Sequence, residues 1–119
     1  MKLPGPEHPI TIEPFAGRVV VRLGGEVVAD STSALCLREA SYPPTWYVPR
    51  ADVRAESVRA SAHTTYCPYK GDASYWTFVV GDRASADAAW SYEAPYAAVA
   101  AIAGHLAFYP DRVDAIETY

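Results

Sequence analysis

The sequence predicts a mostly β domain of small, curled antiparallel sheets with one short helix near residues 95–103. Short runs of apolar and β-branched residues are separated by Gly and Pro turns, which is typical of hairpins. Only one stretch has a helix-forming composition, so the helix plays a minor part. With 119 residues, half of them hydrophobic, residues 10–119 fit a single domain and residues 1–9 form an extended Pro-rich lead-in.

The first hairpin is the strongest local signal. Residues 18–23 alternate between two faces, and residues 26–31 form a second run of similar character. Gly24 and Gly25 lie between them, and a two-residue hairpin turn requires the positive φ angles that Gly adopts readily. We therefore expect two antiparallel strands joined at these glycines.

Further strands follow along the chain. Residues 34–37 and 45–48 have strand character, and residues 74–80 are rich in β-branched and aromatic side chains. Residues 83–92 are expected to pair back on that last strand, although their alanines favour it only weakly. Residues 50–59 are polar and predict at most a short helical turn.

The helix is expected after Pro95, because Pro is well tolerated in the first turn of a helix. Residues 96–103 are almost all Ala, Val and Ile, and Gly104 suits the residue that follows a helix. Residues 105–109 and 113–116 then predict two short strands. The alternative is a helix that runs on through the first of them.

The charge pattern limits the classes of partner. A net charge of −4 and a pI near 5.2 argue against a nucleic-acid binder, which needs a basic face. No apolar run is long enough to span a membrane, and the N-terminal residues lack a secretory apolar segment. Cys36 and Cys67 form no Cys-x-x-Cys pair, so a structural zinc site of the usual spacing is not expected. We expect no other cofactor. We expect a cytoplasmic protein with reduced thiols.

Residues 63–76 carry the highest density of reactive and stacking groups. They hold a histidine, a thiol, a lysine, a carboxylate and four aromatic rings beside a Pro and a Gly. This composition predicts a pocket wall. Lys70 is expected to contact an anion or a carbonyl group. The alternative is a solvated loop lysine that pairs with Asp72.

Catalytic candidates lie in the same stretch. Cys67 could act as a nucleophile if His63 or Lys70 activated its thiol, with Asp72 as an orienting group. Residues four apart on a strand stand about 13 Å apart, so a bend would be needed to bring His63 to Cys67. The alternative is that Cys67 is a small buried apolar residue.

Aromatic side chains dominate the predicted strands. Their simplest role is core packing, but buried tyrosine hydroxyls and indole N–H groups need hydrogen-bond partners. A cage of aromatic and charged groups suits a planar or anionic ligand. Strand alternation places Tyr75 and Trp76 on opposite faces. The predicted ligand-binding residues are Arg38, Tyr47, Lys70, Asp72, Tyr75, Trp76 and Trp90.

Several stretches together resemble a known family. They are Leu37-Arg-Glu-Ala-Ser-Tyr-Pro-Pro, Tyr47-Val-Pro-Arg, residues 63–76, Ala89-Trp-Ser-Tyr and Ala107-Phe-Tyr-Pro-Asp-Arg-Val. They resemble the domain-of-unknown-function 427 family, sometimes labelled nucleotidyltransferase-like. The resemblance runs from about His8 to Glu117. It implies a small mostly β domain similar to the β-tent folds of methionine sulfoxide reductase B and the thalidomide-binding domain of cereblon.

Two departures limit what this resemblance implies. The β-tent relatives hold zinc through two Cys-x-x-Cys pairs, which this chain lacks, so no metal is carried over. Nucleotidyltransferases use paired acidic residues or a lysine in a Lys-x-Asp-Gly context, whereas this chain has Lys70-Gly-Asp-Ala. The favoured hypothesis is therefore small-molecule binding at the Cys67–Trp76 loop. The alternatives are a small enzyme using Cys67, and a protein-interaction module, with the chain a monomer or a homodimer.

Overall fold

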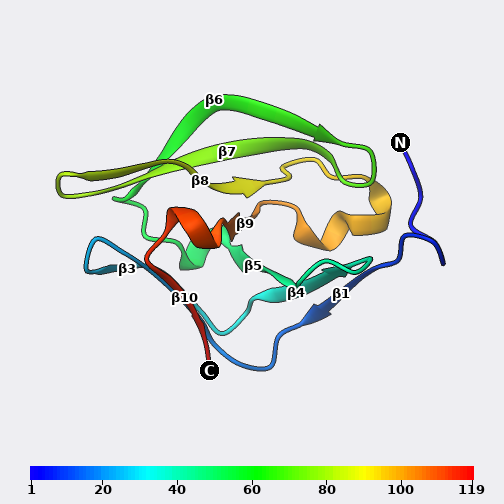
Figure 1. The fold of residues 1–119 in the computed structure, drawn as a ribbon, viewed down its shortest axis with the longest axis horizontal. Coiled ribbons are helices and arrows are strands. Elements are labelled where there is room, and N and C mark those ends of the chain that lie inside the picture. The colour runs from blue at the N-terminus through cyan, green and yellow to red at the C-terminus, as the bar shows by residue number, and fades with distance from the viewer.

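The computed structural model describes residues 1–119 and consists of two antiparallel β-sheets (Figure 1). The larger sheet has seven strands in the order β1-β4-β5-β9-β8-β7-β6, and the smaller has three in the order β10-β2-β3. The strands are β1 (Ile10–Pro14), β2 (Val19–Leu23), β3 (Glu26–Ser31), β4 (Leu35–Glu39), β5 (Thr45–Pro49), β6 (Val58–Cys67), β7 (Gly71–Val80), β8 (Arg83–Ser91), β9 (His105–Phe108) and β10 (Ala115–Thr118). This confirms the mostly β, antiparallel fold; the likeness to β-tent folds stays a prediction.

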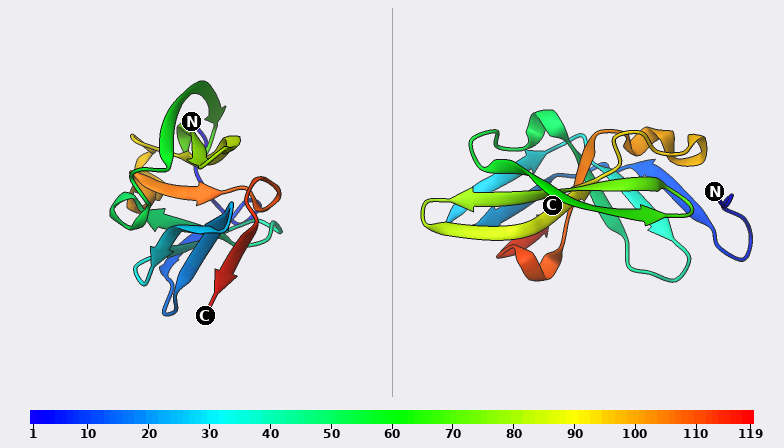
Figure 2. Two further views of the ribbon diagram at one scale, coloured as in Figure 1. Left: turned by 90° about the vertical axis from the view of Figure 1, so that its left-hand side faces the viewer. Right: turned by 90° about the horizontal axis from the view of Figure 1, so that it is seen from above.

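The β6–β8 part of the large sheet lies opposite the small sheet, whereas its β1, β4 and β5 part lies on the same side as the small sheet (Figure 1). Seen end-on, β6, β7 and β8 form one side, the small sheet forms the other, and β9 runs between them (Figure 2). The molecule measures 44 × 33 × 23 Å. The three helical elements are single 3₁₀ turns or pairs of turns, and none is long and apolar enough to cross a membrane.

The β2–β3 hairpin forms where the glycines predicted it. Gly24 and Gly25 have φ angles of 60° and 81°, and each strand pairs with the other along its length. The inward face carries apolar side chains with almost no exposure, including Val19, Val21 and Val28. The turn forms at the predicted glycines, but Val20 on the opposite face of β2 is also only 1% exposed, so burial does not follow the alternation there.

The alanine-rich strand β8 pairs with β7 as expected. Ala88 and Ala89 are fully buried, and Ala89 lies opposite Trp76 on β7 and Phe108 on β9. A small side chain suits this position because Ala89 lies between two large cross-strand neighbours in a close-packed core. Packing in the sheet thus outweighs the weak strand preference of alanine.

The helix expected near residues 95–103 is replaced by η2 (Ala97–Ile102), two 3₁₀ turns separated by non-helical φ/ψ angles at Val99. Val99 and Ile102 are buried, and this spacing of three suits a 3₁₀ turn. Gly104 has a φ angle of 70°, and β9 follows it directly. The alternative of a helix continuing through residues 105–109 is therefore wrong. The other two turns are η1 (Arg50–Asp52) and η3 (Pro110–Arg112).

The hydrophobic core is divided into two clusters on opposite faces of the large sheet. On β9, Leu106 and Phe108 belong to one cluster, whereas the intervening Ala107 belongs to the other. Alternate residues of a strand face opposite sides, so the sheet itself separates the clusters. The small sheet covers the first cluster, and η2 covers the second.

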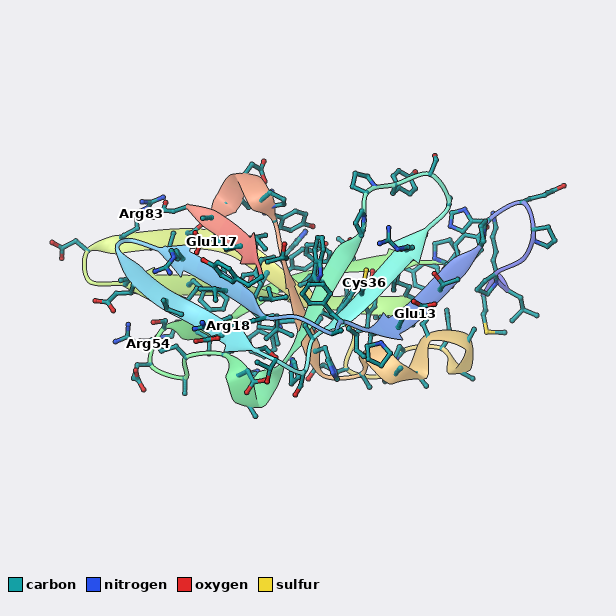
Figure 3. The ribbon with its side chains drawn as sticks, turned by 90° about the horizontal axis from the view of Figure 1, so that it is seen from below. Glu13, Arg18, Cys36, Arg54, Arg83 and Glu117 are labelled. Atoms are coloured by element: carbon teal, nitrogen blue, oxygen red, sulfur yellow. The ribbon has the colours of Figure 1, made fainter.

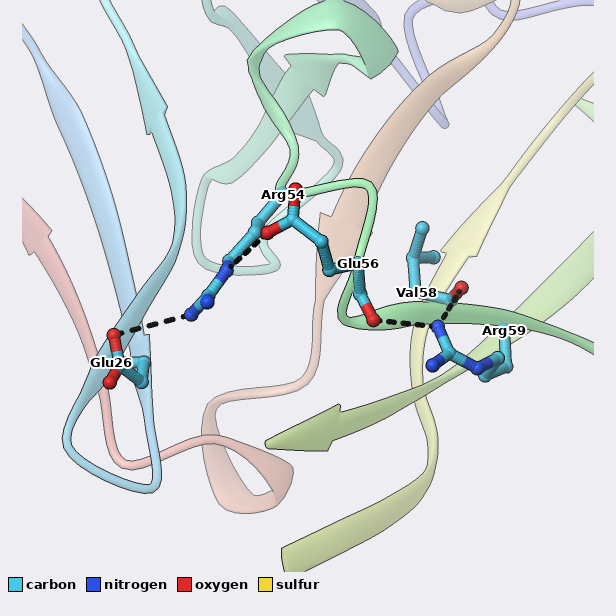
Figure 4. Close-up of polar contacts among 5 residues, drawn as sticks. All are labelled: Glu26, Arg54, Glu56, Val58 and Arg59. Carbon is cyan, nitrogen blue, oxygen red and sulfur yellow. Dashed lines mark hydrogen bonds and ion pairs between the residues drawn. The ribbon is translucent and has the colours of Figure 1, made fainter. Parts of the chain in front are cut away.

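Charged side chains gather around the small sheet (Figure 3). Arg54 pairs with Glu26 on β3 and with Glu56 in the loop before β6, and Arg59 donates to the backbone carbonyls of Glu56 and Val58 (Figure 4). These ion pairs are exposed, so each contributes little to stability. These charged side chains lie at the edge of the small sheet, whereas the two hydrophobic clusters form the interior.

Candidate functional site

A cavity of about 690 Å³ lies where the large sheet splits. Strands β5 and β9 pair only at Val48–Leu106 and Pro49–His105. Beyond these positions the strands diverge, and Trp46, Tyr47 and Phe108 line the cavity. The loop between β4 and β5, with Tyr42 to Pro44, forms part of its rim.

The cavity wall has two chemically different ends. One end contains the only two charged residues of the lining, Glu39 and Lys70, with a group of aromatic side chains. The other end contains aliphatic side chains from β2 and β10. The aromatic end is lined by Tyr47, Tyr75, Trp90, Tyr92 and Tyr109, and the other end by Val19, Val21, Val48 and Ile116 with the rings of Trp46 and Phe108.

Lys70 is held by the three-residue loop that joins β6 to β7. Its backbone N–H donates to the carbonyl of Cys67 at 3.3 Å, and its carbonyl accepts the N–H of Tyr96 at 3.0 Å. Gly71 follows with a φ angle of 108°, a conformation that residues with a Cβ rarely adopt. The Lys-Gly order in the sequence thus turns the chain and directs the lysine inward.

The Lys70 ammonium forms a buried ion pair. Lys70 is only 7% exposed, and its Nζ donates to Oε1 of Glu39. The pairing with Asp72 considered from the sequence is wrong, because Asp72 is exposed on β7 and Lys70 pairs across the fold. The second carboxylate oxygen of Glu39 contacts Nε2 of His8 at 2.7 Å. Burial alone raises the pKa of Glu39, but the hydrogen bonds from Lys70 and His8 outweigh it and lower that pKa.

The N-terminal lead-in packs against this loop. His8 stacks on Tyr69 with ring centroids 4.0 Å apart, and the backbone N–H of Lys2 donates to the carbonyl of Pro68 at 2.7 Å. A short bridge between Gly5 and His8 closes the segment on itself. Residues 1–9 therefore help to position Glu39, and through it Lys70.

The aromatic end is joined by ring contacts and weak hydrogen bonds. Trp90 lies 4.5 Å from Tyr109 between ring centroids and donates its indole N–H to the hydroxyl of Tyr47 at 3.3 Å. Tyr109 donates to the hydroxyl of Tyr75 at 3.3 Å. Burial raises the pKa of Tyr47 and Tyr92, and burial with the Tyr75 hydrogen bond raises the pKa of Tyr109 to about 12. All of these phenols are therefore neutral donors at physiological pH.

Several donors at this cavity have hydrogen-bonding capacity that the protein does not use. The Tyr92 hydroxyl makes no hydrogen bond, and the Tyr47 hydroxyl accepts from Trp90 without passing on its own proton. Besides Glu39, the Lys70 Nζ lies 3.9 Å from the Cys67 sulfur and 5.9 Å from the centroid of the Tyr92 ring. The indole N–H of Trp46 is the one buried side-chain donor without any partner. An unpaired buried donor is rare and costly, so the Trp46 N–H points to an absent acceptor.

The cavity brings together four of the seven residues predicted to bind a ligand, namely Tyr47, Lys70, Tyr75 and Trp90. Arg38 and Asp72 are exposed and lie outside the wall. Trp76 faces away from Tyr75, as the alternation predicted, and donates to Ser91 at 2.9 Å with Arg50 stacked over its ring. The role of all seven in ligand binding stays a prediction.

Of the four catalytic candidates, only Lys70 lines the cavity, whereas Cys67, His63 and Asp72 do not. Cys67 is half-buried at the end of β6 beside Lys70, but it does not line the wall. His63 is exposed in a bulge of β6, with its ring 4.5 Å from that of Tyr75. No three His, Cys, Asp or Glu side chains converge as metal ligands would. A role for Cys67 as a nucleophile stays a prediction that this geometry does not favour.

Glu39, Tyr92 and Tyr109 belong to the site but were not among the predicted ligand-binding residues. Alternation offered a signal for Glu39, because it shares a face with the buried Leu37 while Arg38 points outward. Tyr92 follows β8 directly, and its place depends on the isolated bridge to Ala103. That contact lies beyond any local pattern in the sequence.

The fold and this cavity define a small antiparallel β domain with an aromatic-lined internal site. The chain belongs to the family described as a domain of unknown function, DUF427, whose model matches residues 11–118. This confirms the resemblance seen in the sequence motifs. No curated protein with a similar sequence was found.

Proposed function

We propose that this domain binds a small planar molecule that brings hydrogen-bond acceptors to the aromatic end of the cavity. The observation that carries the proposal is the set of unpaired donors beside five aromatic rings. The Trp46 indole N–H is buried without a partner, and Tyr92, which also lines the cavity, can direct its hydroxyl to a ligand. The cavity volume of about 690 Å³ is within the range of roughly 300–1,000 Å³ typical of small-molecule sites.

The charge at the site favours a neutral ligand over an anion. Glu39 offsets the charge of Lys70, and the lining contains no other charged side chain. A carboxylate or phosphate would approach Glu39 as closely as it approached Lys70, so attraction and repulsion would largely cancel. A carbonyl oxygen accepts hydrogen bonds without that repulsion, and a flat ring can stack on Trp90 or Tyr109.

The proposal is tested by calorimetric titration with benzamide, which is planar, neutral and carries a carbonyl acceptor. Tyr92→Phe removes one free donor and is expected to weaken benzamide binding about fivefold, the worth of a hydrogen bond of about 1 kcal/mol. Tyr66→Phe is the matched control, because Tyr66 is exposed and bonds only to Tyr96. Benzoate and the non-planar cyclohexanecarboxamide should both bind more weakly than benzamide.

Equal binding by Tyr92→Phe and the wild type would contradict the role given to this hydroxyl. Binding of benzoate in preference to benzamide would contradict the neutral ligand. The alternative role in protein interaction has no specific contact in its favour, and sedimentation of the purified chain decides between monomer and homodimer.

A further inference from the structure

We infer that Lys70 captures its ligand covalently, as an imine formed between its side-chain amine and the carbonyl carbon of a conjugated aldehyde or ketone. This inference rests on the proposed function, because the captured molecule is the planar carbonyl ligand of the same cavity. It goes beyond that function by assigning Lys70 as a nucleophile and by naming the reactive group of the ligand. Three observations support it: the position of the amine, its carboxylate partner and the aromatic wall beside it.

The Lys70 amine lies at the cavity and is largely shielded from bulk solvent. Lys70 lines the wall, and its side chain is only 8% exposed. Its Nζ lies 5.9 Å from the centroid of the Tyr92 ring, so a planar molecule packed on that ring would hold its carbonyl group near the amine. Tyr42, Trp90 and Tyr109 line the same cavity and are exposed or partly exposed, which gives a ligand access from solvent. An amine held beside a bound carbonyl group is what imine formation requires.

Glu39 supplies the base for this step. The Lys70 ammonium donates to Oε1 of Glu39, so the carboxylate is placed to take one proton and release the amine as a nucleophile. The nitrogen bonds to the carbonyl carbon as the carbonyl π bond breaks, and one amine proton moves to the oxygen to give a carbinolamine. Glu39 then returns its proton to this hydroxyl group, the C–O bond breaks and water leaves. The sum is ammonium and carbonyl compound to iminium and water, so no oxidant, reductant or further proton is needed.

The charge balance at Lys70 distinguishes an aldehyde or ketone from an acyl donor. An iminium ion is a cation, so it preserves the positive charge opposite the shielded Glu39 carboxylate. An amide formed from an ester would be neutral and would leave Glu39 with only His8 as a hydrogen-bond partner. A shielded carboxylate that loses its compensating cation is costly. The ion pair therefore favours condensation with a carbonyl compound over acylation.

The sequence provides an internal control, because Lys2 and Lys70 are its only lysines and Lys2 is exposed. The full chain is treated with benzaldehyde and sodium cyanoborohydride, which reduces an imine to a stable benzylamine, and labelled residues are located by peptide mass spectrometry. A lysine with only a structural ion pair would be labelled more slowly than Lys2. We expect Lys70 to be labelled about tenfold faster than Lys2, because the cavity concentrates the aldehyde beside its amine. The Lys70 rate should saturate with benzaldehyde, and benzamide should suppress it without slowing the labelling of Lys2.

Two matched substitutions assign the reacting amine. Lys2→Arg and Lys70→Arg each remove one lysine amine and keep the positive charge, so Lys70→Arg retains a cation opposite Glu39. Lys2→Arg should keep the fast, saturable capture, and Lys70→Arg should lose it. Fast capture that persists in Lys70→Arg would overturn this inference. Labelling of Lys70 no faster than Lys2, in a chain that binds benzamide, would overturn it and leave the proposed function standing. If benzamide neither binds nor slows the labelling of Lys70, the proposed function and this inference both fail.

Discussion

Lys70 and Glu39, which are 31 positions apart in the sequence, form an ion pair in the wall of the cavity. Their side chains are only 8% and 16% exposed. Removing one partner of such a pair leaves the other charge buried without compensation. Neither Lys70 nor Glu39 can therefore lose its charge alone without destabilising the fold around the site.

Lys70→Met is expected to lower the free energy of unfolding by about 3 kcal/mol, because the Glu39 carboxylate then keeps only His8 as a partner. The double variant Lys70→Met/Glu39→Leu should recover most of that loss. Urea unfolding measures both. Arg18→Met is the control, since the Arg18–Asp30 pair is exposed and its loss should change stability little. A double variant as unstable as the single one would contradict this account of the pair.

Protonation of Glu39 should lower the free energy of unfolding at acid pH. Its pKa is lower in the folded protein than in the unfolded chain, despite burial, because Lys70 and His8 donate to its carboxylate. The stability from this group is therefore complete above the unfolded value of about 4.3 and is lost as pH falls through the folded pKa. Glu39→Gln should flatten the acid limb of a plot of unfolding free energy against pH. An acid limb identical to that of the wild type would contradict this.

At alkaline pH, ionisation of the tyrosines with raised pKa values should lower the free energy of unfolding. The pKa values of Tyr47, Tyr92 and Tyr109 are raised, chiefly by burial, so the folded state favours the neutral phenols. This stability is complete below the unfolded tyrosine value of about 10 and is lost as pH rises above it. Tyrosinate absorbance should therefore develop in two phases, with part of the nine tyrosines ionising only on unfolding. A single phase near pH 10 in the folded protein would contradict this.

Gly71→Ala should destabilise the loop that positions Lys70. The φ angle of 108° at Gly71 is strained for a residue with a Cβ, although the added atom would meet its neighbours only at ordinary contact distances. The expected cost is about 1–3 kcal/mol in unfolding free energy, from strain alone. Gly5→Ala is the control, because Gly5 has open space around it and no positive φ angle. Equal stability of the two variants would show that Gly71 tolerates a side chain.

Local patterns predicted the strands, and contacts distant in sequence set most of the site. The β2–β3 hairpin could be read from Gly24-Gly25, because its turn and its alternation lie within one short segment. The ion-pair partner of Lys70 could not be predicted from the sequence. Asp72 lies nearer in sequence, and only the folded structure brings Glu39 to Lys70. The cavity itself depends on where β9 leaves β5, and that is set by the packing of both sheets.

The most direct test of the account uses the three tryptophans as internal reporters. Trp46 and Trp90 line the cavity, whereas Trp76 is bonded to Ser91 away from it. Indole N–H signals in a ¹H–¹⁵N spectrum can be assigned with single Trp→Phe variants and followed during titration with benzamide. The account predicts saturable shifts of the Trp46 and Trp90 signals while the Trp76 signal stays in place. Shifts confined to Trp76, or no shift at any of the three, would contradict it.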